Sequence, residues 1–320
     1  MKILVTGSAG FIGMHLCQRL LTEGHEIHGL DNFNPYYSVA LKRARHAELT
    51  GHPRFSSEEM DISDLDAVTA AFRRFQPEVV CNLAAQPGVR YSIDHPHVYA
   101  RSNVAGFLNI LEACRHHNVR RLVYASSSSV YGGNTKLPFA ETDPVDRPVS
   151  LYAATKKANE LMAHTYTHLY GLQTIGLRFF TVYGPWGRPD MAVWSFTKAM
   201  LANRPIPVFN RGEMRRDFTY IDDIVAGVAA CIRHDGLAPF ELFNIGNNRS
   251  EPLMDLIRIL AETLGVEPRL ELLPMQPGDV PATYADIGRI RAALGFEPTT
   301  PIARGIPLFV AWYRTHGHLS

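Results

Sequence analysis

Short apolar runs and helical patterns alternate along the first half of the chain. Runs that favour strands stand at 2–6, 26–30, 54–57, 78–83 and 121–125, and helical patterns follow the first run and recur near 64–75 and 97–117. Strands that alternate with helices predict a parallel sheet whose two faces are covered by helices. We therefore expect an α/β fold with a doubly wound sheet.

The pattern changes near residue 180. Beyond it the alternation weakens and prolines become frequent, which is typical of short helices and strands joined by turns. With 320 residues the chain exceeds one ordinary domain. We expect a first domain over 1–180 and a smaller α+β lobe over 181–320. The alternation returns within 218–247, so we expect that segment to pack back against the first domain.

A glycine-rich turn stands between the first strand and the first helix. The apolar run 2–6 is followed by Gly7, Gly10 and Gly13, and then by an apolar-periodic segment. Glycine permits the tight turn and lets backbone amides approach a pyrophosphate, whose charge is favoured at a helix N-terminus. This context predicts a Rossmann-type dinucleotide-binding domain.

An acidic residue ends the second strand. Asp31, followed by Asn32, lies about 20 residues beyond the glycines, where a carboxylate accepts hydrogen bonds from ribose hydroxyls and repels a 2′-phosphate. NAD is therefore favoured over NADP. Because ligands collect at the carboxyl ends of parallel strands, we expect the cofactor and substrate crevice at 61–62, 83–86 and 126–129.

Tyr152 and Lys156 stand four residues apart in a helical segment, so they lie on one face. A phenol is a poor base at neutral pH, but a fixed neighbouring cation favours its ionised form. The spacing alone is weak evidence, because an amphipathic helix can carry such a pair by chance. The glycine turn and the serines at 126–129 make a proton-transfer site the stronger hypothesis.

Composition and charge narrow the function classes. The formal net charge is +1, which gives no electrostatic reason to expect a nucleic-acid or membrane partner. The four cysteines are widely spaced, and we expect reduced core residues. His164 and His168 stand four apart without the glutamate of a zinc helix, so we expect no metal. Without a recognisable signal peptide or membrane span, we expect a cytoplasmic protein.

Along nearly its whole length the chain resembles the extended short-chain dehydrogenase/reductases that epimerise nucleotide sugars. The resemblance rests on 7–13, 31–32, 61–62, 83–86, the serines before 130–132, and 152–156. Two longer strings, 178–191 and 216–223, resemble the UDP-glucuronate 4-epimerases and are more specific than the glycine turn. The resemblance implies NAD as the cofactor, UDP-glucuronate and UDP-galacturonate as substrates, and a homodimer formed through helices near 97–117 and 152–170.

The resemblance also implies roles for the residues. Tyr152, activated by Lys156 and the cationic nicotinamide, takes the proton of the sugar 4-hydroxyl while the C4 hydride passes to NAD, and Ser127 hydrogen-bonds the same oxygen. The 4-keto sugar then rotates and receives the hydride on its other face. The residues implied for the cofactor are Gly7, Gly10, Phe11, Ile12, Gly13, Asp31, Asn32, Asp61, Ile62, Leu83, Ala84, Ala85, Gln86, Asn103, Ser126, Tyr152, Lys156 and Phe179. Those implied for the substrate are Pro87, Arg90, Ser127, Ser128, Tyr152, Thr181, Arg188, Phe209, Arg216 and Asp279.

For the nucleotide, the resemblance places Arg216 on the diphosphate and Phe209 beside the uracil. Arginine suits phosphate because its planar fork donates two parallel hydrogen bonds. Gln276 stands where galactose-type epimerases often have arginine, so we expect Arg188 or Arg90 to compensate.

For the sugar, Thr181 stands where UDP-glucose 4-epimerases usually carry asparagine. Ser128 and Thr181 are the candidates for holding the sugar carboxylate. A 4,6-dehydratase would need an Asp-Glu pair where Ser128 and Ser129 stand, so dehydration is disfavoured. UDP-glucose 4-epimerisation and UDP-glucuronate decarboxylation remain alternatives. A non-enzymatic NAD-binding protein is disfavoured, because Ser127, Tyr152 and Lys156 are all present.

Overall fold

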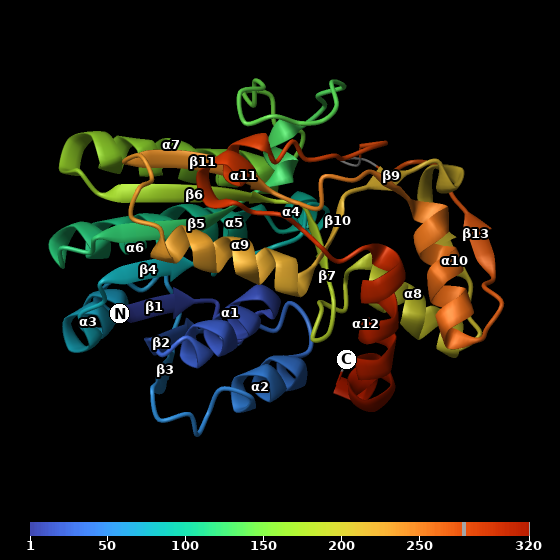
Figure 1. The fold of residues 1–320 in the computed structure, drawn as a ribbon, viewed down its shortest axis with the longest axis horizontal. Helices are drawn as coiled ribbons and strands as arrows, with labels where there is room; N and C mark the ends of the chain where they lie inside the picture. The colour runs from blue at the N-terminus through green and yellow to red at the C-terminus, as the bar shows by residue number, and fades with distance from the viewer. Residues whose placement is uncertain (277–279, 320) are drawn as a thin grey trace.

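The computed structural model describes residues 1–276 and 280–319, and its centre is a seven-stranded parallel sheet (Figure 1). The strands lie in the order β11-β6-β5-β4-β1-β2-β3. Their bounds are β1 Lys2–Thr6, β2 Glu26–Asp31, β3 Phe55–Glu59, β4 Val79–Asn82, β5 Arg121–Ser127, β6 Gln173–Phe179 and β11 Phe240–Ile245. The strand order reverses between β1 and β4, which opens a crevice at the carboxyl ends of these strands. The expected Rossmann-type fold is confirmed.

Helices cover both faces of the sheet because successive side chains of each strand point to opposite sides. In β1, Ile3 and Val5 join a core with α1 and α9, whereas Leu4 joins a second core with α3 and α6. Figure 1 shows these helices stacked along the sheet. The helix bounds are α1 Phe11–Thr22, α2 Val39–Ala47, α3 Leu65–Phe75, α4 Tyr91–Asp94, α5 Pro96–Tyr99, α6 Gly106–His116, α7 Leu151–Tyr170, α8 Ala192–Leu201, α9 Ile221–Arg233, α10 Leu253–Leu264, α11 Gly288–Leu294 and α12 Ile302–His316.

The helical pattern expected near 97–117 is not one regular helix. It consists of α5, a π-helical turn at Ala100–Ala105 and α6. Gly106 follows the turn, and a Cβ there would stand 2.8 Å from the Ile62 side chain. The strand expected at 54–57 is β3, and it spans Phe55–Glu59 instead. Strand β5 extends beyond 125 to Ser127, so the serine segment begins on the sheet.

Several elements of the second half of the chain lie beyond the carboxyl ends of the sheet, where Figure 1 shows α8, α10 and α12 side by side. Three two-stranded sheets connect them, pairing β7 Thr181–Tyr183 with β10 Phe218–Tyr220, β8 Ile206–Val208 with β13 Leu270–Leu272, and β9 Arg215–Arg216 with β12 Glu251–Pro252. The segment 218–247 contains α9, which packs on α1, and β11, which pairs with β6. Where the chain divides into domains stays a prediction.

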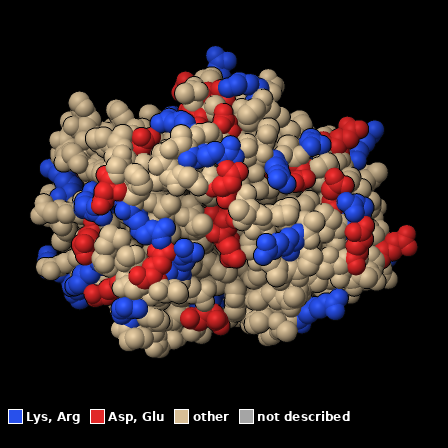
Figure 2. Space-filling view, viewed as in Figure 1, with Lys and Arg blue, Asp and Glu red and all other residues tan. Residues whose placement is uncertain are grey.

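The surface in Figure 2 carries Lys and Arg interspersed with Asp and Glu, rather than one broad patch of a single sign. Within the described residues, no helix has both the length and the apolar character that a membrane crossing requires. The same residues contain no group of three or more His, Cys, Asp or Glu side chains placed to hold a metal ion. The four cysteines are buried and free.

Candidate active site

A cavity of about 800 Å³ lies along the carboxyl ends of the central strands and extends between the sheet and the C-terminal elements. It brings together the glycine turn, the ends of β2, β4, β5 and β6, and the loops near 188–191 and 207–216. Every residue expected for the cofactor lines this cavity except Asn103. Every residue expected for the substrate lines it except Asp279, which lies outside the described residues.

Asn103 stands behind the wall of the cavity. It is 2% exposed, accepts the backbone N–H of Gln86 at 2.7 Å and donates to the Gln86 carbonyl at 3.1 Å. Its amide also donates to the Thr155 hydroxyl at 3.1 Å. The π-helical turn thus directs Asn103 at the chain after β4 and at α7. Asn103 therefore supports the cavity wall from behind, and its assignment to the cofactor stays a prediction.

The cofactor end of the cavity is formed by closely packed backbone. Gly7 has a φ of +71°, and a Cβ there would lie 2.9 Å from the Ala84 nitrogen. A Cβ on Gly13 would lie 2.0 Å from the Gly7 carbonyl oxygen. Asp31 ties the turn to β2, because its Oδ2 accepts the backbone N–H of Ala9 at 3.0 Å. This arrangement leaves room for a pyrophosphate beside the N-terminus of α1.

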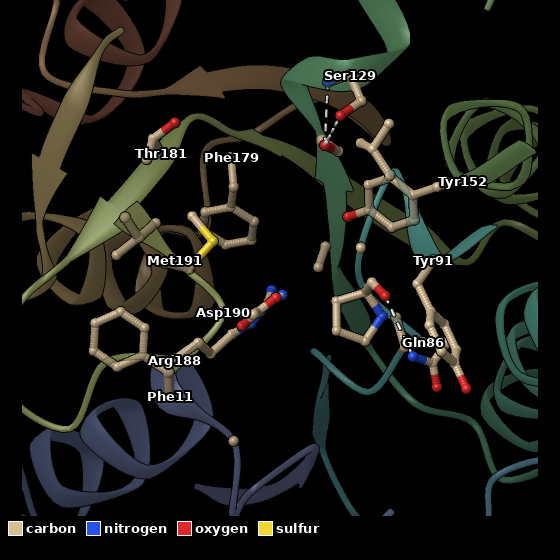
Figure 3. A pocket seen from close by; sticks show the side chains of 18 of the residues that line it. Phe11, Gln86, Tyr91, Ser129, Tyr152, Phe179, Thr181, Arg188, Asp190 and Met191 are labelled. Carbon is tan, nitrogen blue, oxygen red and sulfur yellow. Dashed lines mark hydrogen bonds and ion pairs between the residues drawn. The ribbon is translucent and has the colours of Figure 1, made fainter. Parts of the chain in front are cut away.

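Tyr152, Lys156 and Ser127 meet where α7 crosses the end of β5. The helix begins behind Ser150, whose hydroxyl accepts the N–H of Ala153 at 3.1 Å. The Lys156 ammonium donates to the carbonyl of residue 125 on β5 at 2.8 Å. Figure 3 shows the Tyr152 hydroxyl pointing into the cavity, across from Phe179 and Thr181. The three side chains implied for catalysis, Tyr152, Lys156 and Ser127, therefore share one corner of the cavity.

Burial sets the acid–base properties of this corner. It raises the pKa of the Tyr152 phenol, while the Ser127 hydroxyl and the charge of Arg188 act in the opposite direction. Burial also lowers the pKa of Lys156 to about 8. Sequence reasoning named Lys156 as the cation acting on the phenol, which stays a prediction, whereas the cation that acts to lower the pKa of Tyr152 in the structure is Arg188. The protein alone keeps Tyr152 protonated at neutral pH, so further positive charge is needed before the phenol becomes a base.

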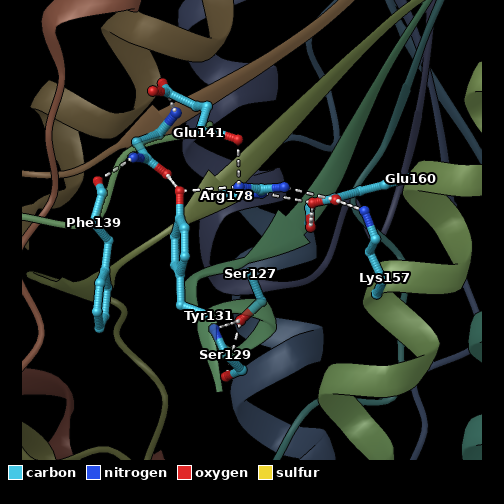
Figure 4. Close-up of polar contacts among 10 residues, drawn as sticks. Ser127, Ser129, Tyr131, Phe139, Glu141, Lys157, Glu160 and Arg178 are labelled. Atoms are coloured by element: carbon cyan, nitrogen blue, oxygen red, sulfur yellow. Dashed lines mark hydrogen bonds and ion pairs between the residues drawn. The ribbon is translucent and has the colours of Figure 1, made fainter. Parts of the chain in front are cut away.

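A buried polar network supports the serine segment from behind (Figure 4). Arg178 donates to both carboxylate oxygens of Glu160, at 2.8 and 2.9 Å, and both side chains are 1% exposed. Ser126 donates to the same carboxylate at 2.7 Å. Arg178 also donates to the Tyr131 hydroxyl at 3.0 Å. Because every charge is paired at good geometry, the network fixes β5, β6 and α7 relative to one another.

Side chains from distant loops form the opposite end of the cavity. The guanidinium of Arg90 lies over the Phe209 ring, 4.9 Å from its centre. Arg216 lies on β9 and donates to the carbonyl of residue 281 at 3.2 Å. Thr181 is held by a backbone hydrogen bond to the carbonyl of residue 217 at 3.1 Å. This end combines cations and an aromatic face, which suits a nucleoside diphosphate.

Sequence reasoning did not identify several residues that line the cavity. Tyr36 and Tyr91 supply aromatic rings, 4.9 Å apart between centres, and Asp190 supplies a carboxylate next to Arg188. Asp190 stands inside a string used for the resemblance, but no local pattern marked it as facing the cavity. Tyr36 lies in the loop after β2, where the sequence carries no periodic signal.

Comparisons with known proteins agree with this geometry. The curated UDP-glucuronate 4-epimerase 4 of Arabidopsis thaliana is 48% identical over 98% of this chain and 75% of its own length. The probable UDP-glucuronate 4-epimerase of Rhizobium meliloti (strain 1021) is 43% identical over 98% of this chain and 97% of its own. Both relatives align along almost the whole of this chain.

Solved structures show the same similarity. The crystal structure of UDP-glucuronic acid 4-epimerase from Bacillus cereus, in complex with UDP-glucuronic acid and NAD, is 34% identical, with a TM-score of 0.93 over 98% of this chain and 99% of that one. A variant of that enzyme with one tyrosine replaced by phenylalanine is in complex with UDP-4-deoxy-4-fluoro-glucuronic acid and NAD. Residues 3–246 match the NAD dependent epimerase/dehydratase family model. The chain belongs to this family.

Proposed function

We propose that this protein interconverts UDP-glucuronate and UDP-galacturonate by NAD-dependent epimerisation at C4. The main supporting observation is that Tyr152, Lys156 and Ser127 line one corner of the cavity. This cavity extends from the glycine turn at Gly7–Gly13 to the cations and the aromatic ring near Arg90 and Phe209. Relatives with UDP-glucuronate 4-epimerase names, at 43% and 48% identity, support the choice of substrate.

The residues present fit NAD. The glycines of the turn allow the backbone to approach a pyrophosphate, and a Cβ at Gly7 or Gly13 would fill that space. Asp31, Asn32 and Asp61 would hold the adenosine side, and Phe179 and Lys156 the nicotinamide side. When bound, NAD supplies a hydride acceptor and later a hydride donor, together with positive charge beside the phenol.

The chain's own residues would move the proton. Tyr152 accepts the proton of the sugar 4-hydroxyl, and the Lys156 ammonium stabilises the negative charge that develops. Ser127 hydrogen-bonds the same sugar oxygen and relays the proton. After the 4-keto sugar has rotated within the cavity, the hydride would return to the opposite face of C4 and Tyr152 would return the proton to the C4 oxygen. Proton acceptor and donor are therefore the same side chain.

Specificity for a uronate would come from neutral donors near C6. Ser128 and Thr181 both line the cavity, and they are our candidates for the sugar carboxylate. A fixed carboxylate matters chemically, because the 4-keto intermediate is a β-keto acid that can lose carbon dioxide. Arg216 and Arg90, with Phe209, would hold the diphosphate and the uracil at the other end. Arg188 would supply a further cation from its place across from Tyr152.

A mass-resolved product assay tests the proposal. The purified protein is incubated separately with UDP-glucuronate, UDP-glucose and UDP-galactose. Formation of UDP-galacturonate without a pentose product supports it. A UDP-pentose would instead indicate decarboxylation, and faster conversion of UDP-glucose would indicate a UDP-hexose 4-epimerase on the same fold.

We further propose that the protein works as a cytoplasmic homodimer that pairs through α6 and α7. Leu108 on α6 and Leu161, Leu169 and Tyr170 on α7 are 40 to 59% exposed, so these two helices offer apolar side chains to a second copy of the chain. Light scattering tests the dimer, and Leu161→Lys should convert it to a monomer. A monomeric unmodified protein would contradict this part of the proposal.

A further inference from the structure

Arg188 and Asp190 form an ion pair inside the cavity (Figure 3). The Nε of Arg188 donates to Oδ1 of Asp190 at 3.1 Å, and Nη2 donates to Oδ2. The side chains are 23% and 31% exposed. A carboxylate is an unexpected neighbour in a cavity for a substrate that carries several negative charges, because like charges repel. Its presence therefore calls for a physical reason.

Asp190 is also held by a residue from a distant part of the chain. The Tyr36 hydroxyl donates to its Oδ2 at 3.2 Å, from the loop after β2. The loop that carries Arg188 is anchored as well, since the buried Arg45 donates to the carbonyl of Trp186 at 2.7 Å and to that of Gly187 at 2.8 Å. The ion pair is therefore held both by Tyr36 and by the anchored loop that carries Arg188.

Arg188 projects into the cavity beside Met191 and across from Tyr152 (Figure 3), so it can reach a sugar held at the Tyr152 hydroxyl. Its charge acts on the Tyr152 phenol, the group proposed to take the sugar proton. Arg90 stacks instead on Phe209 at the nucleotide end. A guanidinium has five N–H donors in a rigid fork, so Asp190 occupies one edge and leaves another for a ligand.

Building on the proposed function, we propose that Asp190 is a positioning residue. It fixes the Arg188 guanidinium across from Tyr152 and balances its charge, so that a uronate can turn within the cavity without being trapped in an ion pair. Unopposed arginine forms strong bidentate pairs with carboxylates. Such a pair made with the bound substrate and broken as the ring turns would stabilise the ground state alone and slow turnover.

The test replaces the charge while keeping the shape. Binding of UDP-glucuronate and UDP-glucose is measured by calorimetry in Tyr152→Phe and in Tyr152→Phe/Asp190→Asn, and turnover is measured with Asp190→Asn alone. We expect Kd and KM for UDP-glucuronate to fall about tenfold and kcat to fall about tenfold, with little change in UDP-glucose binding. Tyr36→Phe, which removes one hydrogen bond from the carboxylate, should act in the same direction but less.

Two controls separate this role from a structural one. Asp255→Asn on α10 removes an equally charged but 46% exposed side chain and should leave both constants unchanged. Asp190→Glu keeps the charge and should recover part of kcat. A rise in KM for UDP-glucuronate, an equal effect on UDP-glucose, or unchanged kcat in both Asp190→Asn and Tyr36→Phe would overturn the inference. If the unmodified protein fails to epimerise UDP-glucuronate, the proposed function itself is wrong.

Discussion

The two ends of the cavity are built from different parts of the chain. At the cofactor end, main-chain atoms make the wall, and the distances from a Cβ on Gly7 or Gly13 to its neighbours show that no side chain fits there. At the sugar and nucleotide end, side chains such as Arg90, Phe209 and Thr181 come from segments far apart in sequence. The first end suits a cofactor shared by a whole family, whereas the second can change its substrate through single side chains.

Tyr152 lies where the two ends meet, so its replacement should have the largest effect. Tyr152→Phe removes the proton acceptor and keeps the ring, and kcat should fall by about 10²- to 10⁴-fold. NAD should remain bound, because the cofactor end is untouched. Single-turnover kinetics and the cofactor content of the purified variant check both statements. Activity near that of the unmodified protein would show that another group accepts the proton.

A methyl group at the cofactor end should damage binding and stability together. In Gly13→Ala the new Cβ would meet the Gly7 carbonyl oxygen at 2.0 Å, so the backbone must shift. Overpacking of this kind costs about 1 to 3 kcal/mol in the free energy of unfolding, and NAD should be lost on purification. Gly133→Ala is the matched control, since its nearest neighbour is 4.0 Å away. If the two variants unfold at the same temperature, the space beside Gly13 is not as restricted as the structure indicates.

A change at the sugar end should alter specificity and spare the cofactor. Thr181→Val removes the hydroxyl at nearly constant shape, which leaves a uronate carboxylate short of one donor. The cost of about 1 to 3 kcal/mol corresponds to a roughly 5- to 150-fold loss of kcat/KM for UDP-glucuronate. The value for UDP-glucose should change less, and bound NAD should not change. Equal losses of kcat/KM with both substrates would mean that Thr181 does not distinguish a carboxylate from a hydroxymethyl group at C6.

The smallest expected effect is on the pH profile. The pKa of Lys156 is lowered to about 8 by burial, so its stabilising charge is present below that pH and lost above it. The raised pKa of Tyr152 keeps the phenol protonated across the same range. We expect kcat/KM to decline as the pH rises through about 8. Lys156→Arg, which stays charged, should move the decline to higher pH, whereas a profile that is flat through this range in the unmodified protein would count against the ammonium's role.

Much of the fold follows from local sequence signals. The apolar run of β1, the glycine turn and the spacing of Tyr152 and Lys156 each act within a few residues, so the sheet and the helical position of Tyr152 could be predicted. The π-helical turn at Ala100–Ala105 could not, because it lies within one continuous helical pattern of the sequence. Helical periodicity in a sequence does not distinguish an α-helix from a π-helical turn.

The candidate site was predictable where a motif and a resemblance coincided, and less so elsewhere. Asn103 was assigned to the cofactor, but its contacts with Gln86 form only when the π-helical turn packs against the chain after β4. The hydrogen bond from Tyr36 to Asp190 spans 154 residues. Neither position carries a local pattern, so only the folded chain brings them together.

Isotope retention at C4 tests the central claim most directly. UDP-glucuronate with deuterium at C4 is converted in unlabelled water, and the product is analysed by mass spectrometry. The account predicts UDP-galacturonate that keeps the deuterium, because the hydride leaves and returns within one closed site while the proton moves through Tyr152. Absence of UDP-galacturonate, or a product that has lost the deuterium to solvent, would contradict it.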